Sequence, residues 1–281
     1  MNIRKVIDYT LVGLFWLTGL FILLVLIAII SYLISKGAPF ISIEFLLGNP
    51  KGLPIGNEGG IFPAIKGTLW LILLALTIST IPALLTAIYL SEYGQDGKLA
   101  SMINIFVQSM AGLPSIVIGL FVYALGVVYL GWGISLLAGG VALAIMILPV
   151  IVVSSRDALL AVNDNYRLIA TSLGVSKYYA FFKVILPQAI PGILAGILLA
   201  MGYAAGATAP IMVTAAAIVA SSSGALFEPV MALPYHLYIL VNEHMSMNMA
   251  YATALVLVGL LLILNFLALG LQSIQERINS Q

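Results

Sequence analysis

The chain has 281 residues, of which 62% are hydrophobic and 7% are charged, with a mean hydropathy of +1.16 and a net charge of +1. Soluble globular domains carry about 25% charged residues, so this composition excludes them and indicates an integral membrane protein. The near-neutral charge gives no sign of nucleic-acid binding, and a chain without cysteine has no disulfide or thiolate metal site.

Apolar segments long enough to cross a bilayer recur along the chain. A helix needs about 20 apolar residues to cross the hydrocarbon core. Such segments are predicted at 11–34, 64–90 (broken at Pro82), 103–130, 134–154, 191–219 and 250–271. Polar loops at 35–63 and 220–247, a hydrophilic turn at 91–98 and a tight turn at 131–133 separate them. The sequence predicts an all-α membrane protein with six transmembrane helices in one domain, 11–271, between a short N-terminus (1–10) and a tail (272–281).

The distribution of basic residues predicts the orientation in the membrane. Six crossings put both termini on the same side as the segment around 156–190. That side holds Arg4, Lys5, Lys98, Arg156, Arg167, Lys177, Lys183 and Arg277, whereas the other side holds Lys36, Lys51 and Lys66. Because basic residues concentrate on the cytoplasmic side, both termini are predicted to be cytoplasmic. The protein is expected in the cytoplasmic membrane with its two long loops outside.

A charged segment at about 156–190 interrupts the apolar pattern between the fourth and fifth predicted helices. Its charged residues are Arg156, Asp157, Asp164, Arg167, Lys177 and Lys183. Placing so many charges at the bilayer centre would cost several kcal/mol, so this segment stays in water. Its pattern is typical of two helical pieces hinged at Gly174, which suits a docking surface for another protein.

The sequence carries no chemistry of its own to drive transport. The Walker A pattern that cradles phosphate is absent, and no nucleophilic catalytic set is present, so the chain is predicted not to be an enzyme. The cores of the six predicted helices contain no Asp, Glu, Lys or Arg, which argues against a carrier coupled to protons or sodium. His236 and His244 with Glu243 could be metal ligands, but ordinary loop residues are the simpler interpretation, and no metal is expected.

The charged segment resembles the coupling loop of ABC importer permeases, in which Glu-Ala-Ala is followed by Gly and later by Ile-x-Leu-Pro. The matching residues are Ala170, Gly174, Ile185, Leu186 and Pro187, while Leu168 stands where the family has Glu. The resemblance implies that two short helices dock on a cytoplasmic ATPase. The expected docking residues are Arg167, Leu168, Ala170, Leu173, Gly174, Leu186 and Pro187.

Further segments are similar to the PstA-type phosphate permeases. They are Gly-Gly-Ile-Phe-Pro-Ala-Ile-Lys-Gly-Thr-Leu at 59–69, Ala-Ile-Tyr-Leu-Ser-Glu-Tyr at 87–93, Ala-Gly-Leu-Pro-Ser-Ile-Val-Ile-Gly-Leu-Phe at 111–121, Thr-Ala-Pro at 208–210, Leu-Pro-Tyr-His-Leu-Tyr at 233–238 and Leu-Asn at 264–265. The resemblance implies the type I ABC importer permease fold and inward movement of inorganic phosphate. It also implies a homologous permease as heterodimer partner, a cytoplasmic ATPase dimer that binds ATP and Mg, an extracytoplasmic phosphate-binding protein, and no cofactor in this chain.

One departure from that family concerns the substrate. The family reads Ala-Arg-Ala-x-Gly-Glu-Thr-Ala-Pro, and here Tyr203 replaces the Arg and Ala207 replaces the Glu. Residues four apart stack on one face of a helix, and losing both members of a buried pair leaves no lone charge. We interpret the change as a removed ion pair. A permease for another oxyanion (sulfate, molybdate or tungstate) remains an alternative, as does a passive channel or membrane scaffold.

Glycine and proline residues within the predicted helices mark a candidate translocation path. Proline removes a helical hydrogen bond and glycine lets backbones approach closely; neutral donors there would pass an anion without trapping it. The candidates are Gly112, Pro114, Ser115, Arg156, Gly206, Thr208 and Pro210. Helix packing alone is the alternative for the glycine and proline residues, and an interfacial anchor is the alternative for Arg156.

Overall fold

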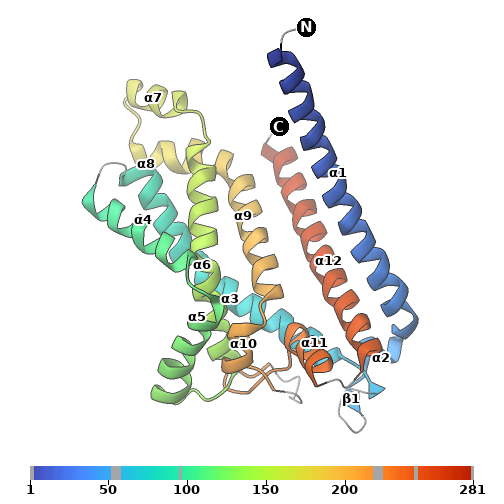
Figure 1. Cartoon of the computed structure of the whole chain (residues 1–281). Helices are drawn as coiled ribbons and strands as arrows, with labels where there is room; N and C mark the ends of the chain where they lie inside the picture. Colours follow the sequence, from blue (N-terminus) through green and yellow to red (C-terminus); the bar gives the residue numbers. More distant parts are fainter. Residues whose placement is uncertain (1–2, 52–57, 95–96, 218–223, 244–245, 280–281) are drawn as a thin grey trace.

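The structure is a computed structural model that describes residues 3–51, 58–94, 97–217, 224–243 and 246–279 (Figure 1). Its long helices are α1 (Ile3–Gly37), α3 (Phe62–Ile88), α4 (Lys98–Ala111), α6 (Leu136–Leu160), α9 (Leu186–Gly206) and α12 (Met247–Asn279). The shorter helices are η1 (Ala38–Phe40), α2 (Ile43–Leu47), η2 (Tyr89–Tyr93), α5 (Ser115–Val122), η3 (Tyr123–Tyr129), α7 (Asn165–Ser172), α8 (Lys177–Ala180), η4 (Phe181–Ile185), α10 (Ala209–Thr214) and α11 (Leu233–Asn242). A small hairpin pairs β1 (Pro50–Lys51) with β2 (Glu58–Gly59).

The helices follow the predicted order of membrane crossings. Within the described part of the chain, five helices are long and apolar enough to span a bilayer, and a sixth span results if α4 and the helix after it count as one bent pair. The start of α1 and the end of α12 lie at the same end of the molecule as α7 and α8, while β1, α2 and α11 lie at the other end (Figure 1). We call these the α7 end and the α11 end. The prediction of an all-α membrane fold is confirmed.

The centre of the molecule is formed by α3, α6 and α9, which pack closely. Two thirds (67%) of the most apolar stretch of α6 is buried, and glycines set the spacing of its neighbours. A Cβ atom on Gly196 of α9 would come within 2.4 Å of the Ser154 Cβ on α6, and one on Gly139 of α6 within 2.4 Å of the Ala215 Cβ. Close approach at small residues is the usual basis of helix packing in membranes.

The first helix stands apart from this centre, whereas α12 packs against α9 on one side and α1 on the other. None of the most apolar stretch of α1 is buried, and α1 packs against α12 (Figure 1). At the α11 end their backbones meet, because a Cβ on Gly37 would lie 2.6 Å from the Tyr251 carbonyl oxygen, and the Tyr32 and Tyr251 hydroxyls are 3.2 Å apart. A helix that is apolar and exposed around most of its surface suits contact with lipid.

Two predicted interruptions in the helices differ from the structure. The break expected at Pro82 is wrong, because α3 continues through it; membrane helices tolerate proline when neighbouring groups satisfy the backbone carbonyl that it frees. Conversely, 103–130 is not one straight helix, since α4 and the helix that starts at Ser115 meet at 100°. Pro114 cannot donate a backbone hydrogen bond and disfavours helix at the preceding residue.

The fifth predicted helix is displaced along the chain. One apolar helix runs over Lys177–Gly206 and is long enough to span a bilayer, so it begins before the predicted start at 191. Leu186 and Pro187 lie within it, and their role in docking stays a prediction. The helix ends at Gly206, because Ala207 has extended backbone angles (φ −74°, ψ 119°), and α10 starts at Ala209 with Pro210 in its first turn. Residues 218 and 219, the predicted end of this helix, lie outside the described part of the chain.

Candidate coupling and translocation sites

At the α7 end the chain turns at Gly174, between the short helix α7 and the short segment α8, which is the first turn of the helix that continues through η4 into α9. Gly174 has φ +67°, a left-handed conformation that glycine adopts without steric cost, and its N–H donates to the Thr171 carbonyl at 3.1 Å. The next helix, α8, is capped by Ser176, whose Oγ accepts from the Tyr179 N–H at 3.3 Å. The structure therefore has the two helical pieces predicted around Gly174.

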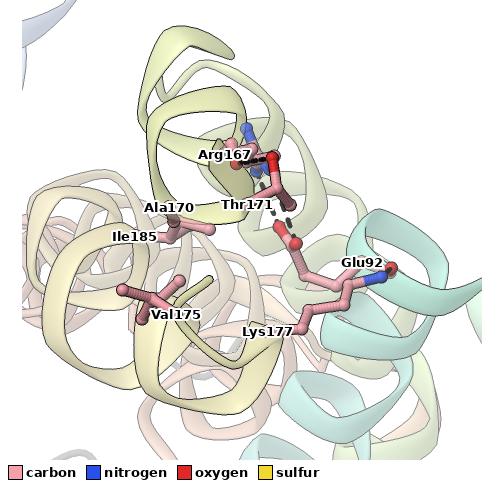
Figure 2. A pocket seen from close by; sticks show the side chains of 8 residues that line it. Glu92, Arg167, Ala170, Thr171, Val175, Lys177 and Ile185 are labelled. Carbon is pink, nitrogen blue, oxygen red and sulfur yellow. Dashed lines mark hydrogen bonds and ion pairs between the residues drawn. The ribbon is translucent and has the colours of Figure 1, made fainter. Parts of the chain in front are cut away.

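A buried carboxylate ties the first of these helices to the end of α3 (Figure 2). Glu92, in the π-helical turn η2, is only 6% exposed, and its Oε1 lies 2.6 Å from Arg167 Nη2 while Oε2 accepts from Nε at 3.4 Å. The guanidinium also donates to the carbonyls of Leu159 (3.0 Å) and Val162 (3.1 Å) and to Asp164 Oδ1 (3.0 Å). The hydrogen bond to Glu92 raises the pKa of Arg167 above its ordinary value. Such two-point pairs are strong and directional.

The second helix is attached to the same place through Lys177. Its Nζ donates to the Glu92 backbone carbonyl and lies 4.6 Å from the centre of the Tyr93 ring. We call Glu92, Arg167 and Lys177 the Glu92 clasp. The clasp borders a cavity of about 270 Å³ between the two short helices and the spanning helices; its other lining residues are Ala170, Thr171, Val175, Ala180 and Ile185 (Figure 2).

The clasp was not among the predicted features. Glu92 falls in 91–98, which was predicted to be a hydrophilic turn, whereas both Ser91 and Glu92 are buried. The signal available in the sequence was a lone acidic residue at the end of an apolar helix, a position where an unpaired carboxylate would be costly. Nothing in the spacing indicated that its partner, Arg167, follows 75 residues later.

The predicted docking residues divide between two faces. Leu168 (63% exposed) and Leu173 (74%) lie on the outer surface, and so do Ile169, Tyr178 and Tyr179. Arg167 and Ala170 instead face inward, toward the clasp and its cavity. Clustered exposed apolar side chains are typical of a surface that contacts another protein or lipid.

The residues predicted to line a path lie at two helix breaks that the fold brings together. Gly112 and Pro114 are exposed in the bend between α4 and α5, and Ser115 opens α5. Gly206 and Thr208 stand at the break between α9 and α10. The helices that follow the two breaks cross closely, since a Cβ on Gly119 of α5 would lie 2.7 Å from the Cα of Pro210 in α10.

Arg156 lies apart from these breaks, near the α7 end of α6. Its Nη1 donates to Asn104 Oδ1 of α4 at 3.2 Å. Its Nε is buried and has no hydrogen-bond partner among the described residues.

The histidine considered as a metal ligand is buried at the α11 end. His236 Nδ1 lies 3.4 Å from Thr253 Oγ1, and burial lowers the pKa of His236 to about 4, so its ring is neutral at physiological pH. Glu243 is exposed, and His244 lies outside the described residues. No group of three metal-ligating side chains was found in the described ranges.

The positions where the family carries an ion pair are both uncharged and do not form a helical pair. Tyr203, in the last turn of α9, is 52% exposed, while Ala207 follows the helix in an extended conformation. The predicted stacking of these two positions on one helical face is therefore wrong, because the helix ends between them.

Comparison with known proteins gives the family. Residues 83–278 match the model of the "Binding-protein-dependent transport system inner membrane component". The phosphate transport system permease protein PstA 2 of Mycobacterium bovis is 33% identical over 94% of this chain and 87% of its own length; PstA of Pasteurella multocida is 37% identical over 72% and 68%. In fold, the chain is similar to a chain of the inward-facing MetNI methionine ABC transporter, with a TM-score of 0.65 at 16% identity over 76% of this chain and 97% of that one. The chain belongs to the binding-protein-dependent inner membrane transport components and, among these, to the PstA-type ABC importer permeases.

Proposed function

We propose that this chain is the permease subunit of an ATP-driven importer and moves inorganic phosphate inward by alternating access. The observation that carries the proposal is the 33% identity to a phosphate permease over 94% of the chain. Membership of a binding-protein-dependent transport family favours this role over a passive channel or scaffold. The bent and broken helices around Gly119 and Pro210, including Ser115 and Thr208, supply neutral groups for the path.

The surface around Leu168 and Leu173 is the proposed docking site for a cytoplasmic ATPase dimer, which binds the ATP and Mg. The Glu92 clasp then links docking to the membrane. Arg167 bonds both to Glu92, at the end of α3, and to the Leu159 carbonyl of α6. Since α3 and α6 form the packed centre, a displacement of α7 would move both helices together.

The remaining partners follow from the same role. One chain with six crossings supplies half of a pathway, so a homologous permease is proposed to complete it as a heterodimer. A phosphate-binding protein would approach the α11 end, and both termini, at the α7 end, would be cytoplasmic. Lipid would surround the exposed face of α1.

A permease for another oxyanion is the second candidate. The observation in its favour is the uncharged pair of positions at Tyr203 and Ala207, where the resembled family carries Arg and Glu. An anion of different charge or size would not need the same fixed cation along its path.

Uptake of labelled phosphate into proteoliposomes tests the proposal. The vesicles would hold this chain with its partner permease, the ATPase and the binding protein. ATP-dependent uptake that only unlabelled phosphate inhibits is expected. Inhibition by sulfate, molybdate or tungstate instead would support the second candidate, and ATP-independent flux would exclude both.

A further inference from the structure

One face of α4 is polar although the helix belongs to an apolar pair that could cross the bilayer. The polar residues recur every three or four positions and therefore share a face: Lys98, Ser101, Asn104 and Gln108. They line an open hollow of about 570 Å³, which we call the α4 hollow, together with Gly97, Ala100 and Ile105. Apart from Ser109, the rest of α4 presents mainly apolar side chains such as Met102 and Phe106.

The charges around the α4 hollow are positive. Lys98 lines it directly, and Arg156 reaches Asn104, another of its lining residues, from α6. None of the described residues that line it is acidic. The Nε of Arg156 is a buried donor that has no acceptor among the described residues, and a buried donor of this kind is costly unless something accepts from it.

The α4 hollow lies between the α7 end and the candidate path. Lys98 begins α4 next to the α7 end, whereas Gln108 lies one turn before the exposed bend at Gly112. Within a bilayer, polar groups on an exposed helix face need water or polar partners. The polar face therefore indicates a hydrated route along α4, from the bend at Gly112 toward the α7 end.

We propose that the α4 hollow is an oxyanion site on the cytoplasmic half of the path. This inference rests on the proposed function, in so far as the transported species is an oxyanion. The ammonium of Lys98, the Ser101 hydroxyl and the Gln108 amide donate to its oxygens, and Arg156, hydrogen-bonded to Asn104 behind them, adds positive charge. Two cations concentrate anions at the mouth, and neutral donors deeper in the site bind weakly enough to release them.

Single cysteine substitutions test the site directly, because the natural chain contains no cysteine. Ser101→Cys and Gln108→Cys would be made in the complete transporter and treated with a sulfonate-bearing or a quaternary-ammonium thiosulfonate reagent of similar size. The anionic reagent is expected to react about tenfold faster than the cationic one because the positive field concentrates anions. Millimolar inorganic phosphate should slow the reaction, and Arg156→Gln should reduce the preference for the anionic reagent.

Ser109→Cys is the matched control. Ser109 neighbours Gln108 but lines a different, apolar concavity with Phe106, Met110 and Leu113, so its labelling should show no charge preference and no protection by phosphate. Unreactive cysteines at 101 and 108, or equal rates with the two reagents, would overturn the proposal.

The same experiment separates this inference from the proposed function. An anionic preference with protection by tungstate or sulfate, but not by phosphate, would support the oxyanion site while overturning the assignment of phosphate. Phosphate uptake in the complete transporter with no charge preference at either cysteine would support the proposed function while overturning the oxyanion site.

Discussion

The two ends of the molecule hold their buried polar groups by different means. At the α7 end a charged pair is buried beside neutral Ser91, since Glu92 pairs with Arg167 at 2.6 Å. At the α11 end they are neutral: Thr68 Oγ1 accepts from the Leu233 N–H at 2.8 Å and ties α3 to α11, while His236 lies against Thr253 of α12. A charged pair is strong and directional but leaves a lone buried charge when broken. The α7 end is thus suited to transmit movement, and the α11 end to maintain shape.

Removing the Glu92 carboxylate from the α7 end should have the largest effect on stability and on transport. Glu92→Ala leaves the guanidinium of Arg167 without its buried partner. We expect the free energy of unfolding to fall by about 3 kcal/mol, which is at the lower end for a broken buried pair because Arg167 stays partly exposed. ATP-driven uptake and co-purification of the ATPase should both fall. Glu92→Gln keeps the shape and one acceptor and should lie between wild type and Glu92→Ala. Wild-type uptake by Glu92→Ala would show that the clasp does not serve coupling.

Acid should lower the stability of the α11 end, where the buried polar groups are neutral. The pKa of His236 is about 4 in the folded protein against about 6.5 when unfolded, so below pH 6.5 the unfolded chain binds a proton that the folded chain does not. Stability should therefore fall as the pH drops from 6.5 to 4, by about 3 kcal/mol in total, and should then level off. Thermal unfolding of the solubilised complex at several pH values measures this. His236→Gln should remove that part of the pH dependence; an unchanged slope would contradict the assignment.

The sequence predicted the crossings but not the connections between them. A long apolar run predicts a spanning helix from its own residues, so the six crossings could be found one at a time. The Glu92–Arg167 pair depends on residues 75 positions apart, and no local pattern marks it. Pro82 and Pro114 show the same limit: each removes one helical hydrogen bond, yet α3 continues and α4 ends, because the surrounding structure decides which proline bends the chain.

A single hydrogen bond at the neutral end should matter for stability but not for coupling. Thr68→Val preserves the side-chain shape but leaves the buried Leu233 N–H without its acceptor, which should cost about 2 kcal/mol. The unfolding midpoint should drop, while the ratio of phosphate transported to ATP hydrolysed should stay as in wild type. Thr68→Ser, which restores the oxygen, should recover most of the stability. A changed transport ratio in Thr68→Val would mean that the α11 end also participates in coupling.

Two glycines with the same backbone strain allow the ends to be compared at equal energetic cost. Gly174, beside the clasp, has φ +67°, and Gly131, between α5 and α6 on the loop away from the clasp, has φ +70°; a Cβ at either position would meet nothing within 4 Å. Replacing each with alanine should cost about 1 kcal/mol, through the left-handed backbone alone. Because only Gly174 sets the angle between α7 and α8, Gly174→Ala should lower ATP-driven uptake, whereas Gly131→Ala should lower only the unfolding midpoint. Equal losses of uptake in the two variants would mean that general destabilisation, rather than the geometry of the two short helices, limits transport.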